Sequence, residues 1–322
     1  MPQAKRKYAR YLLTDYVGLA AVLGLLILFF GTQTEHFLSR TTFWTIANQI
    51  PDATIIAVGM TMVLIIAGID LSVGSILALG GAALGVVLIR GWPLGVGIAA
   101  CVAMGLLCGA INGALVIRWR LPAFIVTLGM MEAARGAAQL MTGSRTQYIG
   151  ESIEQVTNAS VLGLSLPFFV AVIVVIAGQV LLSNTLFGRH MFAVGANEES
   201  ARLSGISINR IKLAVYMASG TLAALAAVIH CARMAAADPN SGIGYELQAI
   251  AAVVIGGTSL MGGRGSVINT FFGVIIIAVL ENGLVQIGTQ DPIKRLVTGS
   301  VIVLAVIVDY YRHRLRQRSP GA

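Results

Sequence analysis

The residues of this chain that could do chemistry are polar and ionisable side chains set inside long apolar runs. Such groups are costly inside a membrane, and they usually face protein or a water-filled path. Glu132 and Arg135 are three residues apart, so a helix would place both on one face. We expect a structural ion pair between them, and a position along a solute path is the alternative. The other candidates for a solute path or for polar contacts within the membrane are Asn112, Glu246, Gln248, Asn269, Glu281 and Asn282.

The segment GIDLSVG, residues 68–74, interrupts a nearly continuous apolar stretch from 46 to 89. It predicts either a tight cytoplasmic turn or a discontinuous helix. Asp70 and Ser72 lie in this break, and we expect the Asp70 carboxylate to cap the helix that follows rather than to contact a solute. The mid-run residues Asn112 and Asn269 favour hydrogen bonds between helices.

The sequence contains no recognisable catalytic or metal-binding motif. There is no HExxH zinc motif and no GxSxG nucleophile elbow. The glycine-rich run GGTSLMGGRGS, residues 256–266, lacks the Lys-Ser or Lys-Thr of a phosphate loop, and its small residues favour close approach of backbones instead. Cys101, Cys108 and Cys231 lie in apolar runs without metal-ligand spacing, so we expect them in the core. We therefore predict no enzyme activity, no metal site and no cofactor bound by this chain.

The composition requires lipid to be the solvent for most of the chain. Of its 322 residues, 57% are hydrophobic and only 11% are charged, and the mean hydropathy is +0.83. A soluble domain usually carries about a quarter charged residues. The net charge of +8 lies in loops and tails, which is typical of membrane topology signals and not of a nucleic-acid-binding surface.

Because a bilayer-spanning helix needs about 20 mostly apolar residues, the sequence predicts an all-α, polytopic membrane helix bundle with about ten spans. An eight-span bundle is the alternative if two short segments are re-entrant. No separate soluble domain is expected, so residues 1–322 form a single transmembrane domain. The predicted spans cover residues 14–31, 46–67, 72–89, 94–117, 122–142, 165–183, 212–232, 245–260, 267–288 and 296–311.

The positive charges indicate how these spans are oriented. With the N-terminus inside, fifteen of the 22 Lys and Arg residues fall on cytoplasmic segments, six fall outside, and Arg135 lies within a span. This bias predicts that both termini are cytoplasmic. The first apolar run follows several basic residues but lacks a small-residue cleavage site, so we expect a retained span and not a signal peptide.

The long charged stretch from Phe187 to Lys212 predicts a short capped helix. Asn197 can be its N-cap, with carboxylates in the first turn near the positive end of the helix dipole, and Gly205 can close it. A helix of two turns is not stable alone in water, so we expect a docking element within a cytoplasmic loop, 184–211. The predicted docking residues are Asn197, Glu198, Glu199, Ala201, Arg202, Leu203 and Gly205.

From about residue 45 to 309, the chain resembles the ribose-type permease subunits of bacterial ABC sugar importers. The resemblance implies a helical inner-membrane subunit that pairs with a second copy or a paralogue. It also implies cytoplasmic ATPase subunits, which use ATP and Mg²⁺ and contact the loop carrying NEESARLSGI, and an extracytoplasmic sugar-binding protein. The matching segments are IIAVGMTMVLIIAGIDLSVGSILAL at 55–79, LPAFIVTLGMMEAARG at 121–136, FGRHMFAVGANEESARLSGI at 187–206, GYELQAIAAVVIGGTSLMGGRGS at 244–266 and ENGL at 281–284.

Two positions depart from the family pattern. Gln248 stands where the family commonly has an acidic residue in YELDAIA, and Glu281 stands where it often has asparagine. Both could face a solute path, so the sequence does not identify the transported sugar. The resemblance to the family is unaffected by these two differences.

The predicted function is therefore import of a monosaccharide by alternating access. The alternatives are a stand-alone secondary transporter or channel for a small polar solute, and a structural membrane protein. A secondary transporter has no need for the docking element, and the ionisable residues within the spans argue against a structural protein.

Overall fold

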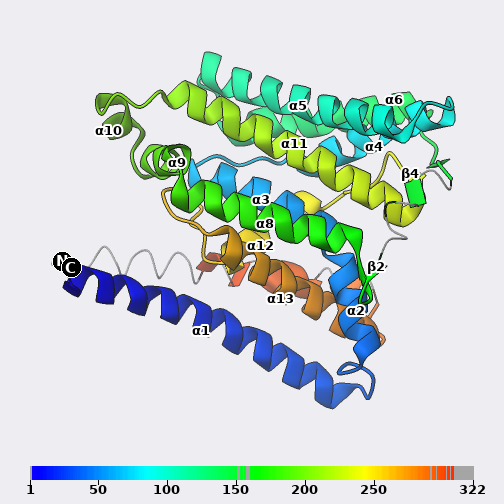
Figure 1. The fold of residues 1–322 in the computed structure, drawn as a ribbon, viewed down its shortest axis with the longest axis horizontal. Helices are drawn as coiled ribbons and strands as arrows, with labels where there is room; N and C mark the ends of the chain where they lie inside the picture. Colours follow the sequence, from blue (N-terminus) through cyan, green and yellow to red (C-terminus); the bar gives the residue numbers. More distant parts are fainter. Residues whose placement is uncertain are drawn as a thin grey trace.

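Most of the chain folds into helices that run alongside one another (Figure 1). The computed structural model describes residues 2–150, 153, 154, 156, 160–290, 292–294, 296–301, 303, 304, 306 and 307. Among them, β1 pairs with β4 and β2 with β3, both antiparallel. The elements are α1 (Pro2–Gln33), α2 (Arg40–Gln49), α3 (Pro51–Ile65), α4 (Val73–Ile89), α5 (Leu94–Arg118), α6 (Ala123–Thr142), β1 (Gln147–Tyr148), β2 (Ser160–Val161), β3 (Leu164–Ser165), α8 (Leu166–Asn184), α9 (Leu186–Ala196), α10 (Glu198–Leu203), α11 (Ile208–Met234), β4 (Ala236–Ala237), α12 (Tyr245–Ile255) and α13 (Val267–Gln286).

A helix occupies each of the first nine predicted spans. By length and apolar composition, four described helices can each cross a membrane, namely α5, α8, α11 and α13. A fifth candidate is α2 with α3, which are bent by 47° where Pro51 begins α3. The helical prediction is confirmed in this coarse form. The tenth predicted span, 296–311, is helical at its described residues up to 307, and the rest of it lies outside the described residues.

The GIDLSVG segment separates α3 from α4 inside the bundle. After α3 ends, Ala67 turns the chain with a left-handed φ of 58°. Figure 1 then shows an extended segment running back along the bundle before α4 begins. Asp70, Ser72 and Val73 are completely buried, each with 0% exposure. α4 therefore begins inside the protein, and the choice between a cytoplasmic turn and a discontinuous helix stays a prediction.

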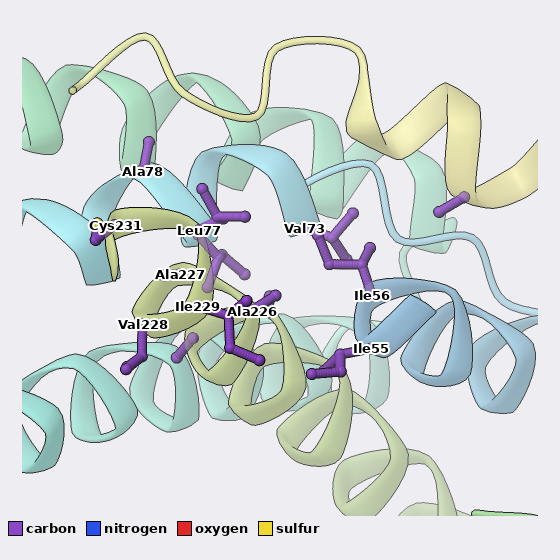
Figure 2. Packing of buried hydrophobic residues seen from close by; sticks show 14 of the residues in the cluster. Ile55, Ile56, Val73, Leu77, Ala78, Ala226, Ala227, Val228, Ile229 and Cys231 are labelled. Carbon is purple, nitrogen blue, oxygen red and sulfur yellow. The ribbon is translucent and has the colours of Figure 1, made fainter. Parts of the chain in front are cut away.

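The main core lies where α3, α4 and α11 meet. Both α3 and α4 are apolar on nearly all sides, which suits helices surrounded by protein. Figure 2 shows Ile55 of α3, Leu77 of α4 and Ala227 of α11 gathered in this core. The three cysteines are buried and free, so the prediction that they are core residues is confirmed.

The α5–α11 contact depends on small residues. A Cβ placed on Gly105 of α5 would collide with the carbonyl oxygen of Gly220 on α11, and one on Gly220 would collide with that of Gly105. A Cβ on Gly109 would meet the carbonyl oxygen of Tyr216 in the same way. Glycine therefore lets the two backbones touch, as is common between helices in membranes.

The two ends of the bundle differ. The α9 and α10 helices lie at one end, on the left in Figure 1, whereas β2 and β4 lie at the opposite end. Along one side, α1 packs against α13, where the Phe30 ring lies against Gly283 and its centroid is 5.4 Å from that of Phe37.

We expect Gly220→Leu to lower the melting temperature of the purified, detergent-solubilised protein, because overpacking a close contact costs about 1–3 kcal/mol. The matched control is Gly24→Leu on α1, where an added Cβ meets nothing within 4 Å. Equal melting temperatures for the two variants would contradict the close α5–α11 contact.

Candidate functional site

The segment predicted to dock a partner forms a capped helix, α10. The Asn197 Oδ1 atom accepts a hydrogen bond of 2.8 Å from the Ser200 N–H, so the predicted N-cap is confirmed. Glu198 and Glu199 lie in the first turn, where the helix dipole favours negative charge.

The other end of α10 closes on a glycine, as predicted. Gly205 has a φ of 78°, and its N–H donates to the Arg202 carbonyl over 3.0 Å. The Ile206 N–H donates to the Ala201 carbonyl over 3.1 Å. This pair of bonds is a Schellman closure, which satisfies carbonyls that the helix end would otherwise leave open.

The α10 helix is fixed on one side and open on the other. Lys212 of α11 holds Glu198 at 2.7 Å, and Ala201 is only 4% exposed. Arg202 lies 3.8 Å from Glu198 and 3.7 Å from Glu199, and such exposed pairs contribute little. Leu203 is 81% exposed, so α10 presents an apolar side chain among charges.

The glycine-rich loop 256–266 packs closely against α9. A Cβ on Gly195 of α9 would collide with the carbonyl oxygen of Ile65, the last residue of α3. That same carbonyl accepts the Gly263 N–H over 2.8 Å, and a Cβ on Gly262 would lie 2.8 Å from the Gly195 carbonyl oxygen. These contacts agree with the predicted close approach of backbones. They connect α9, which precedes α10, to the end of α3.

A buried polar cluster holds the start of α4. Asp70 Oδ1 accepts the Ser72 N–H over 3.0 Å and the Ser72 hydroxyl over 2.6 Å, while Asp70 Oδ2 accepts the Ser219 hydroxyl of α11 over 2.8 Å. Asn112 of α5 donates its Nδ2 to Ser72 Oγ over 2.9 Å. Asn112 therefore forms the predicted bond between elements. Asp70 is structural, but it binds the N-cap residue Ser72 rather than a residue within α4.

Thr127 of α6 provides a hydrogen-bond partner for backbone groups of the extended segment before α4. Its hydroxyl accepts the Leu71 N–H over 3.1 Å and is 3.1 Å from the Ile69 carbonyl, to which it can donate. Three elements, α5, α6 and α11, thus supply hydrogen bonds at this break. A backbone segment without helical bonds needs such partners inside a membrane protein.

The expected ion pair between Glu132 and Arg135 is wrong. The Arg135 Nη1 atom donates to the carbonyls of Pro239 and Ser241, over 2.6 and 2.7 Å, and Glu132 is exposed on α6. A guanidinium prefers two fixed acceptors, and the turn before α12 supplies them. Arg135 therefore ties α6 to this turn.

The two residues that depart from the family pattern contact each other. Gln248 of α12 donates its Nε2 to Glu281 Oε1 of α13 over 3.0 Å, and both side chains are half-buried. One turn further on, Gln286 donates its Nε2 to Asn282 Oδ1 over 3.1 Å and to Thr42 Oγ1 over 2.8 Å. Polar groups thus join α12, α13 and α2.

The remaining predicted path residues lie apart from this pair. Glu246 accepts the Gly244 N–H over 3.2 Å at the start of α12. Asn269 lies in the first turn of α13, and its Oδ1 atom has no hydrogen-bond partner among the described residues. The predicted path residues therefore fall in several places and do not converge on one site.

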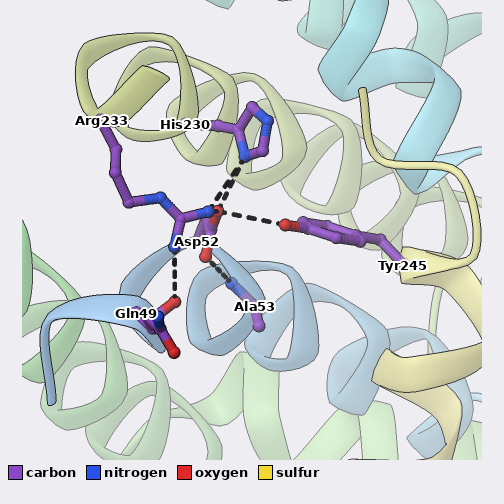
Figure 3. A network of polar contacts seen from close by, with 6 residues as sticks. All are labelled: Gln49, Asp52, Ala53, His230, Arg233 and Tyr245. Carbon is purple, nitrogen blue, oxygen red and sulfur yellow. Dashed lines mark hydrogen bonds and ion pairs between the residues drawn. The ribbon is translucent and has the colours of Figure 1, made fainter. Parts of the chain in front are cut away.

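A buried ionic network was missed by the sequence reasoning (Figure 3). Asp52 of α3 is 1% exposed, and its Oδ2 atom is 2.7 Å from Arg233 Nη2 and 2.9 Å from His230 Nδ1. The Tyr245 hydroxyl donates to the same oxygen over 3.4 Å. His230 is buried, with 8% exposure. Asp52 could have been noticed as a carboxylate inside a predicted span, although nothing local indicates its partners.

Comparison with known proteins places the chain among transport permeases. The family model described as the permease component of branched-chain amino acid transport systems matches residues 42–306. The chain is 40% identical over 315 residues to a ribose import permease protein of Escherichia coli (strain K12), covering 95% of this chain and 96% of that protein. It is 35% identical over 309 residues to the D-allose transport system permease protein of the same strain, with 95% and 94% covered. It is 34% identical over 289 residues to a fructose import permease protein of Rhizobium meliloti, with 85% and 79% covered. No solved structure matches the chain.

We expect Asp70→Ala to lower the melting temperature strongly, because it leaves one N–H and two hydroxyls buried without their acceptor, at about 1–3 kcal/mol for each such group. Glu35→Ala removes a carboxylate from an exposed turn and is the control. If the two variants melted at the same temperature, Asp70 would not hold the break.

Proposed function

The chain belongs to the family of permease components of branched-chain amino acid transport systems, and we infer that it is the permease subunit of an ATP-binding-cassette importer for a sugar. The 40% identity to a ribose import permease over 95% of the chain carries this inference. The relatives for D-allose and fructose support a monosaccharide as the transported class. The chain is a membrane permease and is not itself the ATPase, so ATP and Mg²⁺ are used by partner subunits.

The proposed arrangement is a single transmembrane domain, 1–322, with ten spans and both termini cytoplasmic. The helices found at the first nine predicted spans support the count. The excess of Lys and Arg on the segments assigned to the inside supports the orientation. In this arrangement the α10 end faces the cytoplasm. A second permease, either a copy or a paralogue, completes the membrane part, and a binding protein delivers the sugar from outside.

The proposed ATPase-docking element comprises Asn197 to Gly205. Its support is physical: a helix of six residues is capped at both ends, anchored through Lys212, and presents Leu203 to solvent. A rigid base with an exposed apolar side chain is suited to binding a partner and to passing on its movement. The contacts of α9 with Ile65 and with loop 256–266 give that movement a route to the end of α3.

The proposed solute path includes the Gln248–Glu281 pair. Both residues are half-buried on helices that pack together, and their side chains can exchange hydrogen bonds with hydroxyl groups. Asn282 lies beside Glu281 and extends this polar strip. Asn112 and Arg135 are occupied with bonds that hold the bundle, so we assign them structural roles. Glu132, Glu246 and Asn269 stay candidates for the path.

The proposed function is tested by reconstituting the permease with its ATPase subunits and binding protein in proteoliposomes. We expect sugar uptake that requires ATP and both partners. Uptake that is driven by a proton gradient without the ATPase would contradict the proposal and would favour a secondary transporter.

The same system tests α10. Leu203→Asp should reduce uptake and sugar-stimulated ATP hydrolysis on the order of tenfold, because it places a charge in a contact that excludes water. Leu162→Asp is the matched control, an exposed leucine (84%) between β2 and β3 at the opposite end of the bundle. Full activity of Leu203→Asp would refute the docking role.

We expect Gln248→Glu to reduce uptake, because it replaces a hydrogen-bond donor with a second carboxyl group opposite Glu281. Combining it with Glu281→Gln restores an acid–amide pair and should recover most of the uptake. Such neighbours usually couple by about 0.5–3 kcal/mol. Additive losses in the double variant would mean that the two side chains do not act as a pair.

A further inference from the structure

A cavity of about 530 Å³ lies between α2, the start of α8 and the end of α11. Its volume falls within the range of small-molecule sites, about 300–1,000 Å³. We propose that this cavity, called here the α2 cavity, is a receiving site for a neutral, polyhydroxylated solute. The proposal rests on the proposed function, because it concerns the point at which the permease receives sugar from the binding protein.

One face of α2 supplies hydrogen-bonding groups to the α2 cavity. Thr41, Trp44, Thr45 and Asn48 are spaced at i, i+3, i+4 and i+7, so they share one face of the helix, and all four line the cavity. The hydroxyls of Thr41 and Thr45 can each donate and accept a hydrogen bond, as can the hydroxyl groups of a sugar. The Trp44 indole N–H makes no hydrogen bond to the described residues and can donate to a solute.

The walls of the α2 cavity are fixed by hydrogen bonds of Asn48, and these bonds do not use the Thr41, Trp44 and Thr45 groups. Asn48 accepts the Ser165 N–H over 2.9 Å and donates to the Gly163 carbonyl over 3.2 Å, which holds the β2–β3 turn against α2. Gly163 lies so close to the Trp44 ring that an added Cβ would be 3.1 Å from it. Arg40 lies 5.7 Å from the centre of the same ring. Trp44 is therefore packed as a rigid wall of the cavity, and a preformed site loses less entropy on binding.

The ionisable groups that line the α2 cavity favour a neutral solute, and the Arg40 guanidinium over the Trp44 ring lies outside the lining. Arg233 is the one ionisable residue among those that line it, and its guanidinium is paired with the buried Asp52 at 2.7 Å (Figure 3). A second bond of 3.1 Å to the Gln49 carbonyl fixes its position. The pair is neutral as a whole, while the guanidinium keeps N–H groups that these bonds do not use. Because Arg233 is paired, it attracts an anionic solute less strongly than an unpaired arginine would.

The position of the α2 cavity suits a receiving site. Its lining residues come from α2, α8 and α11 at the end of the bundle where β2 lies, opposite α10 (Figure 1). If α10 meets the ATPase inside, this end faces the side from which a binding protein delivers sugar. Weak binding is expected, since solute must leave the cavity quickly during transport.

Saturation-transfer NMR detects weak binding and tests the α2 cavity directly on the full importer complex in nanodiscs. The probes are D-ribose, D-allose and D-fructose, with D-ribose 5-phosphate as the anionic counterpart. We expect a saturable signal for at least one neutral sugar and a weaker one for the phosphate. Thr45→Val and Trp44→Phe should each weaken binding about fivefold, the effect of one lost hydrogen bond, whereas Thr32→Val on α1 should not.

Equal signals from wild type, Thr45→Val and Trp44→Phe, or a stronger signal for the phosphate than for every neutral sugar, would overturn the proposal. If Trp44→Phe unfolds the protein, sugar binding by Thr41→Val tests the same face of α2 instead. Uptake by the wild-type importer is measured in parallel. ATP-dependent uptake with no effect of the cavity variants on binding would reject the α2 cavity and leave the proposed function standing. Absence of ATP-dependent uptake would reject the proposed function instead.

Discussion

The structure depends on one buried carboxylate, that of Asp70, which allows α4 to begin inside the bundle. A helix that starts within a membrane protein must find partners there for its first N–H groups and for the backbone leading to it. Asp70 receives three hydrogen bonds from Ser72 and Ser219, and Thr127 completes the segment before α4. The start of α4 then reaches the start of α12, where a Cβ on Gly74 would collide with the Gly242 carbonyl oxygen. Two short helices can thus begin beside each other in the interior.

The interior break is joined to the α10 end of the molecule through α3. Ile65 is the last residue of α3 and lies five residues before Asp70, and its carbonyl is held by Gly263. Gly195 of α9 packs against that carbonyl, and α10 follows directly. A movement of α10 relative to the bundle would therefore act on the point where α3 gives way to α4. Such a joint gives a movement of α10 a route into the interior of the bundle.

Local patterns in the sequence predicted local structure well. The Asn197 cap and the Gly205 closure depend on bonds within a few residues, so their spacing alone indicated them. The buried cysteines and the helical spans followed from apolar runs. Arg135 was misassigned because its acceptors lie 104 and 106 residues away, while Glu132 lay at the spacing of a helical pair. Asp52 was missed because His230 and Arg233 are 178 and 181 residues distant. The Gln248–Glu281 bond likewise joins two helices whose packing no local signal specifies.

The central claim is that the bundle has two functionally distinct ends, with α10 inside and the α2 cavity outside. Labelling with a membrane-impermeant thiol reagent tests it most directly, with single cysteines introduced at Leu203 and at Leu162 in a background where the three native cysteines are replaced. We expect Leu162→Cys to be labelled from outside in sealed cells and Leu203→Cys to be labelled only in inside-out vesicles. Labelling of both positions from the same side would contradict it.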